Sequence, residues 1–118
     1  MRIVSANLFC LNPRPRAAME AVAAQNADVV VLIESVKRFQ RLAGDHLPER
    51  RLHGYTRPDG MPVTLHARGD VPLGETREDG DGWLEAVVGG VRLFVVHAVA
   101  PYLPWRWPRR ERQLASLA

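Results

Sequence analysis

The first third of the chain alternates between short apolar runs and a segment with helical spacing. Residues 2–9 and 29–33 are apolar and rich in β-branched side chains, which predicts two buried strands. Between them, residues 16–26 contain strong helix formers with apolar positions on one face. The run Val-Val-Val-Leu-Ile at 29–33 has no polar position, as expected for a strand covered on both faces. This order predicts a βαβ unit with parallel strands and a right-handed crossover.

A second helix is predicted to follow over residues 35–47. Ser35 is the expected N-cap, and Phe39 is expected to face the sheet. Arg38 and Arg41 fall on the opposite side of this helix and are expected to face solvent. The segment ends before Pro48, which cannot continue a helix.

The remaining pattern changes to short strands with glycine-containing turns, which are predicted at residues 59–60, 79–82 and 89–90. The predicted strands are residues 61–67, 73–77, 83–88 and 91–97, with Gly89 and Gly90 as a two-residue hairpin turn. Most acidic residues in this region are expected to be solvated near turns: Asp70, Glu75, Glu78, Asp79, Asp81 and Glu85. The order of elements predicts an α/β (α+β) fold in which a mixed β-sheet is layered with helices.

Composition narrows the class of protein. With 118 residues and 47% hydrophobic content, the chain is expected to form a single domain over residues 1–118. One cysteine excludes an intramolecular disulfide, and no Cys/His spacing fits a structural zinc site. Neither a signal-peptide core nor a run of ~18 apolar residues is present, so we expect a cytoplasmic protein without a membrane span.

The net charge of +3 and the sequence pI of about 9.7 are a mild bias toward anionic partners. Every basic residue except Lys37 is an arginine. The planar guanidinium suits bidentate phosphate recognition. A compositional preference for arginine across the whole chain explains the same bias.

Three polar residues stand at or near the ends of apolar strands, and they are the strongest candidates for chemistry. Asn7 lies near the end of the first strand, Glu34 directly after the second, and His97 after the run 91–96. A carboxylate at the end of a buried strand needs a partner to remain ionised, and Mg²⁺ (or Mn²⁺) would be such a partner. Simpler interpretations stay open at this point: Glu34 could cap the helix near Ser35, and Asn7 and His97 could be a turn residue and a core-edge histidine.

In order and approximate spacing, these residues lie in segments that resemble the opening motifs of a known superfamily. The segments are Ser-Ala-Asn-Leu at 5–8, Ala-Asp-Val-Val-Val-Leu-Ile-Glu at 27–34 and Val-Val-His-Ala-Val-Ala-Pro at 95–101. Together they resemble the endonuclease/exonuclease/phosphatase superfamily, which implies a deoxyribonuclease-I-like sandwich and metal-dependent phosphoester hydrolysis. The resemblance implies that Glu34 binds the metal ion, that Asn7 lies at the metal and takes part in catalysis, and that His97 contacts the scissile phosphate.

The sequence also departs from this superfamily. The later Gly-Asp-x-Asn and Ser-Asp-His motifs do not occur, and Gly44-Asp45-His46 lies too early to replace them, so Asp45 and His46 are expected at the surface. We therefore expect a C-terminally truncated domain that is nearly inert alone. An inner sheet face should be partly uncovered, which predicts marginal stability, self-association or completion by a second chain. The motifs do not distinguish among nucleic acid, sugar phosphate, inositol phosphate and phospholipid substrates.

An aromatic and basic segment near the C-terminus offers a second functional interpretation. Tyr102, Trp105 and Trp107 could stack on bases while Arg106, Arg109 and Arg110 contact phosphates. The alternative is a loop that leads into an amphipathic helix over residues 111–118 with solvated arginines. In that second interpretation of function, the chain is a non-catalytic remnant that binds nucleic acid or another partner, or one half of a split enzyme.

Overall fold

The computed structural model describes residues 1–56, 61–78, 83–98 and 107–116, and their secondary structure follows the predicted order of elements with one additional strand. The elements are β1 (Ile3–Asn7), α1 (Pro15–Ala23), β2 (Val29–Ile33), α2 (Lys37–His46), β3 (Arg50–Thr56), β4 (Pro62–Arg68), β5 (Leu73–Glu78), β6 (Trp83–Val88), β7 (Val91–Val96) and α3 (Trp107–Ala115). The turns predicted at 59–60 and 79–82 lie outside the described residues.

The described strands form two sheets. In the first sheet the strand order is β1-β2-β4-β3, and in the second it is β5-β6-β7. Strands β1 and β2 pair in parallel, from Ile3 opposite Val29 to Asn7 opposite Ile33. All other pairings are antiparallel. The predicted parallel βαβ unit is therefore confirmed.

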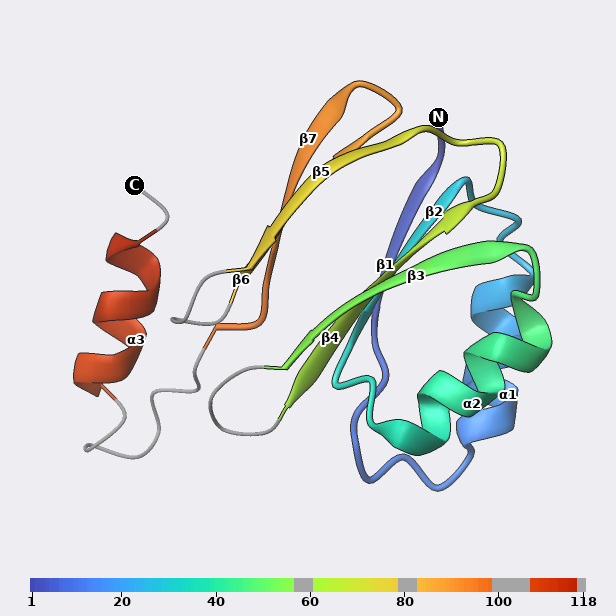
Figure 1. Cartoon of the computed structure of the whole chain (residues 1–118). Coiled ribbons are helices and arrows are strands. Elements are labelled where there is room, and N and C mark those ends of the chain that lie inside the picture. The colour runs from blue at the N-terminus through green and yellow to red at the C-terminus, as the bar shows by residue number, and fades with distance from the viewer. Residues whose placement is uncertain (57–60, 79–82, 99–106, 117–118) are drawn as a thin grey trace.

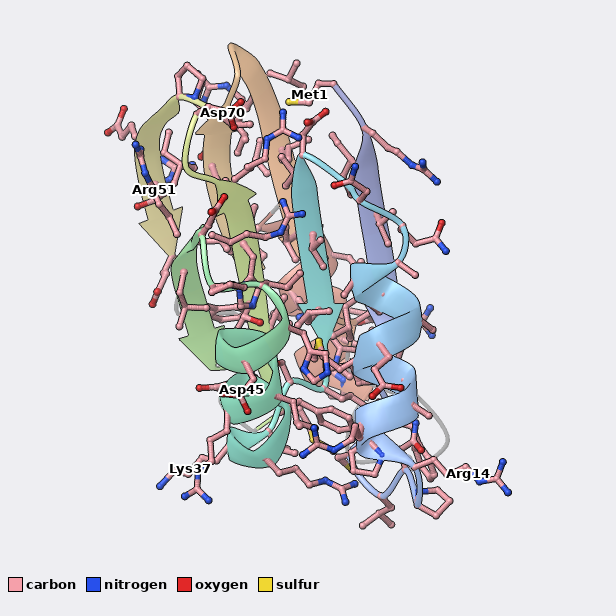
Figure 2. The ribbon with its side chains drawn as sticks, turned by 90° about the vertical axis from the view of Figure 1, so that its right-hand side faces the viewer. Met1, Arg14, Lys37, Asp45, Arg51 and Asp70 are labelled. Carbon is pink, nitrogen blue, oxygen red and sulfur yellow. The ribbon has the colours of Figure 1, made fainter. Side chains whose placement is uncertain are left out.

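The two sheets and the helices are stacked in layers (Figure 1). Helices α1 and α2 cover one face of the first sheet, the second sheet packs against its other face, and α3 lies beyond the second sheet. The indole N–H of Trp83 on β6 donates to the hydroxyl of Ser116, 3.0 Å away, which fixes the end of α3 to this sheet. Figure 2 shows Met1 and Asp70 at one end of this stack and Arg14 and Lys37 at the other.

Strand β2 contributes to two hydrophobic cores because its side chains alternate between the two faces of the sheet. Val30 and Leu32 pack with Met19 and Phe39 under the helices. Val31 belongs to the core between the sheets, with residues of β4 and β6. Each fully buried side chain of this kind stabilises the fold by roughly 1.5–3 kcal/mol. The prediction of a strand covered on both faces is confirmed.

Two element predictions differ from the structure. Strand β3 (Arg50–Thr56) was not predicted, because Arg50, Arg51 and Gly54 break the alternating pattern. An edge strand tolerates such residues, and among the described strands β3 pairs only with β4. Helix α3 begins at Trp107 rather than at residue 111, and Pro108 fits the first helical turn because no intrahelical N–H bond is needed there.

The predicted helix cap at Ser35 is wrong. Helix α2 begins at Lys37 with Val36 as its N-cap, and no side chain caps it. The buried hydroxyl of Ser35 has no hydrogen-bond partner within the described residues. The Ser35 backbone instead connects two elements, since its N–H donates to Pro62 O at 3.0 Å and its carbonyl accepts from Gln40 Nε2 at 2.7 Å.

The predicted hairpin turn between β6 and β7 is confirmed. Val88 pairs with Val91, and the two glycines between them have φ angles of +56° at Gly89 and +81° at Gly90. Two successive positive φ angles are the signature of a type I′ turn, and glycine adopts them without steric cost.

The expectation of a solvated Glu85 is wrong. Glu85 lies on the central strand of the second sheet and is only 6% exposed. Its carboxylate pairs with Arg77 at 2.9 Å and also with Arg92, from the two neighbouring strands. Cross-strand neighbours of opposite charge stabilise such a position.

The expected uncovered sheet face is present at one side of the sandwich. On β1, Val4 and Ala6 pack toward the helices, whereas Ile3, Ser5 and Asn7 on the opposite face are exposed. Val91 at the start of β7 is also exposed, at 45%. None of the helices in the described residues is long and apolar enough to cross a membrane.

Candidate active site

The register of the first sheet explains why two of the predicted residues meet. Asn7 is paired with Ile33 across the parallel strands, so Glu34 follows one position beyond the partner of Asn7. The carboxyl ends of neighbouring parallel strands lie at the same edge of a sheet, where α/β proteins commonly bind ligands. His97 follows β7 directly and comes from the second sheet. The site therefore lies where the ends of both sheets meet.

The three predicted residues are brought together around one carboxylate oxygen. The amide nitrogen Nδ2 of Asn7 donates to Glu34 Oε1 at 3.4 Å. His97 Nε2 lies 3.6 Å from the same oxygen. The side chains of Glu34 and His97 are 15% and 19% exposed, so the pair is largely shielded but still reachable from solvent.

The second carboxylate oxygen is held by the backbone of the loop after β1. Cys10 N–H donates to Glu34 Oε2 at 2.9 Å. Asn7 shapes the start of the same loop, because its Oδ1 accepts the Phe9 N–H at 3.0 Å. Phe9 has a φ of +53°, and Glu34 itself has a φ of +60°. A left-handed backbone is costly for residues other than glycine, and such strain is often found at functional sites.

Glu34 is held in its ionised form. Burial raises the pKa of its carboxyl group, but the Cys10 N–H, the Asn7 amide and the nearby His97 lower it more, so the pKa lies below its usual value. At neutral pH the site therefore presents a carboxylate and not a carboxylic acid.

Arg38 is a part of the site that the sequence did not reveal. Arg38 is exposed, as expected, but its Nη2 also donates to Cys10 O at 2.6 Å and to Asn12 O at 3.0 Å. Asn12 closes the loop further, because its Nδ2 donates to Leu8 O at 3.2 Å. The one sequence signal was the position of Arg38 four residues after Glu34, and this signal is too weak to find the contact.

The alternative role of Glu34 as a helix cap is wrong. Helix α2 starts three positions later, at Lys37, and has no acidic residue in its first turn. The Glu34 carboxylate is turned to the loop after β1 instead, where Cys10 N–H binds it.

The basic residues proposed to contact nucleic acid are only partly described. Arg106 lies outside the described residues, and so does the side chain of Arg109. Arg110 is on α3, whose Gln113 donates from Nε2 to the His97 carbonyl at 3.1 Å. Helix α3 thus supports the backbone at His97, while phosphate contacts by these arginines stay a prediction.

The donor set fits magnesium better than zinc. In the described parts of the chain, no group of three or more His, Cys, Asp or Glu side chains is arranged to hold a metal ion. Structural zinc sites need four such ligands, whereas Mg²⁺ is commonly bound by one or two carboxylates and keeps several waters. One ionised carboxylate beside an amide side chain fits this second pattern.

Comparisons of sequence gave no relative. No protein-family model matches the chain, and no curated protein matches it in sequence.

Comparison with solved structures gave clear matches. The structure of humanized D. rerio TDP2 matches with a TM-score of 0.78 and 19% identity over 99% of this chain and 54% of that one. The structure of C. elegans TDP2 matches with a TM-score of 0.70 and 17% identity over 97% of this chain and 40% of that one. The chain thus spans about half the length of these structures. The chain therefore shares the fold of these TDP2 structures, which confirms the predicted deoxyribonuclease-I-like fold.

Proposed function

We propose that this chain carries the metal-binding and phosphate-binding part of a divalent-metal-dependent phosphoester hydrolase. One observation carries the proposal: Asn7, Glu34 and His97, which are far apart in the sequence, meet around a single carboxylate oxygen. The fold shared with TDP2 structures supports the same class of activity.

Each residue has a distinct role in this proposal. Glu34 would hold Mg²⁺ or Mn²⁺ through its ionised carboxylate, which the Cys10 N–H and the Asn7 amide keep in place. Asn7 orients the carboxylate through its amide, and its side chain would help to hold the metal ion beside Glu34. His97 would donate a ring N–H to a phosphate oxygen of the substrate. A bound cation would polarise the phosphoryl oxygen and lower the cost of the negative charge that develops in the transition state.

We further propose that hydrolysis by this chain alone is slow. The sequence lacks the Gly-Asp-x-Asn and Ser-Asp-His motifs, which the resemblance assigns to positioning water and phosphate. General acid and base groups alone contribute about 10²- to 10⁴-fold to such reactions. Metal binding is therefore a more direct test of the site than turnover.

The test is a titration of the purified chain with Mn²⁺, followed by electron paramagnetic resonance of the free ion. We expect saturable binding that weakens about tenfold or more in Glu34→Gln. The control is Asp45→Asn, which removes an exposed carboxylate from α2 and should bind like the wild type. Wild-type protein without a saturable site, or equal binding by Glu34→Gln, would contradict the proposal.

Hydrolysis of bis(p-nitrophenyl) phosphate with Mg²⁺ or Mn²⁺ measures what the bound cation accomplishes. Turnover that disappears in Glu34→Gln and persists in Asp45→Asn would show that this chain is a working hydrolase. Metal binding without turnover would show that the isolated chain binds the cation but does not hydrolyse this phosphodiester.

A further inference from the structure

We infer that Arg38 is a positioning residue for the metal-binding carboxylate, because it fixes the loop whose Cys10 N–H holds Glu34. The inference rests on the proposed function of Glu34 and extends it to a residue on the neighbouring helix. Arg38 acts through the backbone of residues 10–12 and does not itself contact Glu34 in any described hydrogen bond.

The contacts form a short chain of hydrogen bonds. The Nη2 atom of Arg38 donates to two carbonyls of one loop, Cys10 O at 2.6 Å and Asn12 O at 3.0 Å. The same Cys10 residue donates its N–H to Glu34 Oε2 at 2.9 Å. Arg38 therefore holds the peptide whose N–H faces the carboxylate, and hydrogen bonds from a charged donor are about twice as strong as neutral ones.

The position of Arg38 in its helix supports a specific role. Lys37 and Arg38 are the first two residues of α2, and its first turn contains no acidic residue. Cations near a helix N-terminus are unfavourable because they meet the positive end of the helix dipole. A neutral or acidic residue would suit helix formation better, whereas two carbonyl acceptors offset this cost for Arg38.

The loop after β1 needs hydrogen bonds from outside it because its backbone is strained. Phe9, directly before Cys10, has a φ of +53° and a side chain that is 56% exposed. Neither burial of this ring nor a glycine stabilises that conformation. Local hydrogen bonds of Asn7 and Asn12, together with the Arg38 contacts, hold the loop in shape.

The test compares Arg38→Ala and Arg38→Lys with Arg41→Ala in the complete chain. Arg41 is exposed on the same helix and makes no hydrogen bond or ion pair within the described residues. Two quantities are measured: hydrogen exchange of the Cys10 amide in metal-free protein by NMR, and Mn²⁺ affinity. Thermal unfolding of each variant confirms that it is folded.

We expect Arg38→Ala to speed Cys10 amide exchange about tenfold, as for the loss of a hydrogen bond to a charged group. Mn²⁺ affinity should fall about tenfold, within the range for residues that orient a metal ligand. Arg38→Lys should recover part of both effects because it restores a cationic donor, and Arg41→Ala should match the wild type.

Other outcomes would overturn the inference. Unchanged Cys10 exchange in Arg38→Ala would show that Arg38 does not hold the loop, and faster exchange with unchanged Mn²⁺ affinity would show that the loop does not position Glu34. If Arg41→Ala lost as much Mn²⁺ affinity as Arg38→Ala, the loss would come from removing a positive charge from α2 and not from the contacts of Arg38. If wild-type protein binds no Mn²⁺, the metal role of Glu34 fails, while Cys10 exchange still decides whether Arg38 fixes the loop.

Discussion

The left-handed backbone at Glu34 leads to a prediction about stability that is separate from metal chemistry. Both Glu34→Ala and Glu34→Gly remove the carboxylate that accepts the Cys10 N–H and the Asn7 amide. The free energy of unfolding of both variants should therefore fall by about 1–3 kcal/mol, the range for polar groups that lose a hydrogen-bond partner. They differ in the backbone, because φ at this position is +60°.

The difference between the two variants can be estimated. A left-handed conformation costs an alanine about 1–2 kcal/mol, and glycine avoids this cost. Glycine loses roughly 0.5–1 kcal/mol more conformational free energy on folding. The net expectation is that Glu34→Gly is about 1 kcal/mol more stable than Glu34→Ala, which is about 3–6 °C in Tm for a chain of this size.

The assay is urea unfolding followed by circular dichroism, with Arg41 as the matched control. Arg41 lies inside α2, so Arg41→Gly should be about 1 kcal/mol less stable than Arg41→Ala, the opposite order. If Glu34→Gly is no more stable than Glu34→Ala while the Arg41 pair behaves as expected, Glu34 does not have a strained backbone and the reasoning is refuted.

Two further predictions concern the core. Burial of His66, reinforced by the charge of Arg50, lowers the pKa of its imidazole from 6.5 to about 4. As the pH falls from 6.5 to 4, the unfolded chain therefore binds a proton at His66 and the folded chain does not. Stability should therefore drop by about 3 kcal/mol over that interval, and urea midpoints at several pH values should show a smaller drop in His66→Gln; equal slopes would contradict the prediction. Phe39 is fully buried, so Phe39→Ala should lower the free energy of unfolding by about 3–5 kcal/mol. The Phe94 ring is 51% exposed, so Phe94→Ala should lower it by about 1 kcal/mol. Equal losses in urea unfolding would contradict this assignment of the core.

The local pattern of side chains was sufficient to predict the part of the fold that positions the site. The unbroken apolar run at Val29–Ile33 required a strand covered on both faces, and it placed Glu34 at the strand end. Parallel pairing then followed from the helix between the strands, and this pairing puts Asn7 beside Glu34. These inferences needed only the properties of neighbouring residues.

The remaining contacts of the site depend on backbone groups and on distant residues. Every residue except proline has a backbone N–H, so the identity of Cys10 does not indicate that its N–H binds Glu34. Arg38 is an ordinary exposed helix residue by its pattern, and only the folded loop provides its two carbonyl acceptors. Glu85 was misassigned for a similar reason, since its arginine partners come from two other strands.

The two outer strands of the first sheet differ in how readily they could pair with a β-strand from another polypeptide. Strand β3 begins with Arg50 and Arg51, and charged residues on an outer strand discourage edge-to-edge association. Strand β1, with the sequence Ile-Val-Ser-Ala-Asn, carries no charge along its length. Backbone groups at an outer strand are available for intermolecular pairing unless something blocks them. Strand addition, whether it leads to an ordered assembly or to aggregation, is therefore favoured at β1 and opposed by charge at β3.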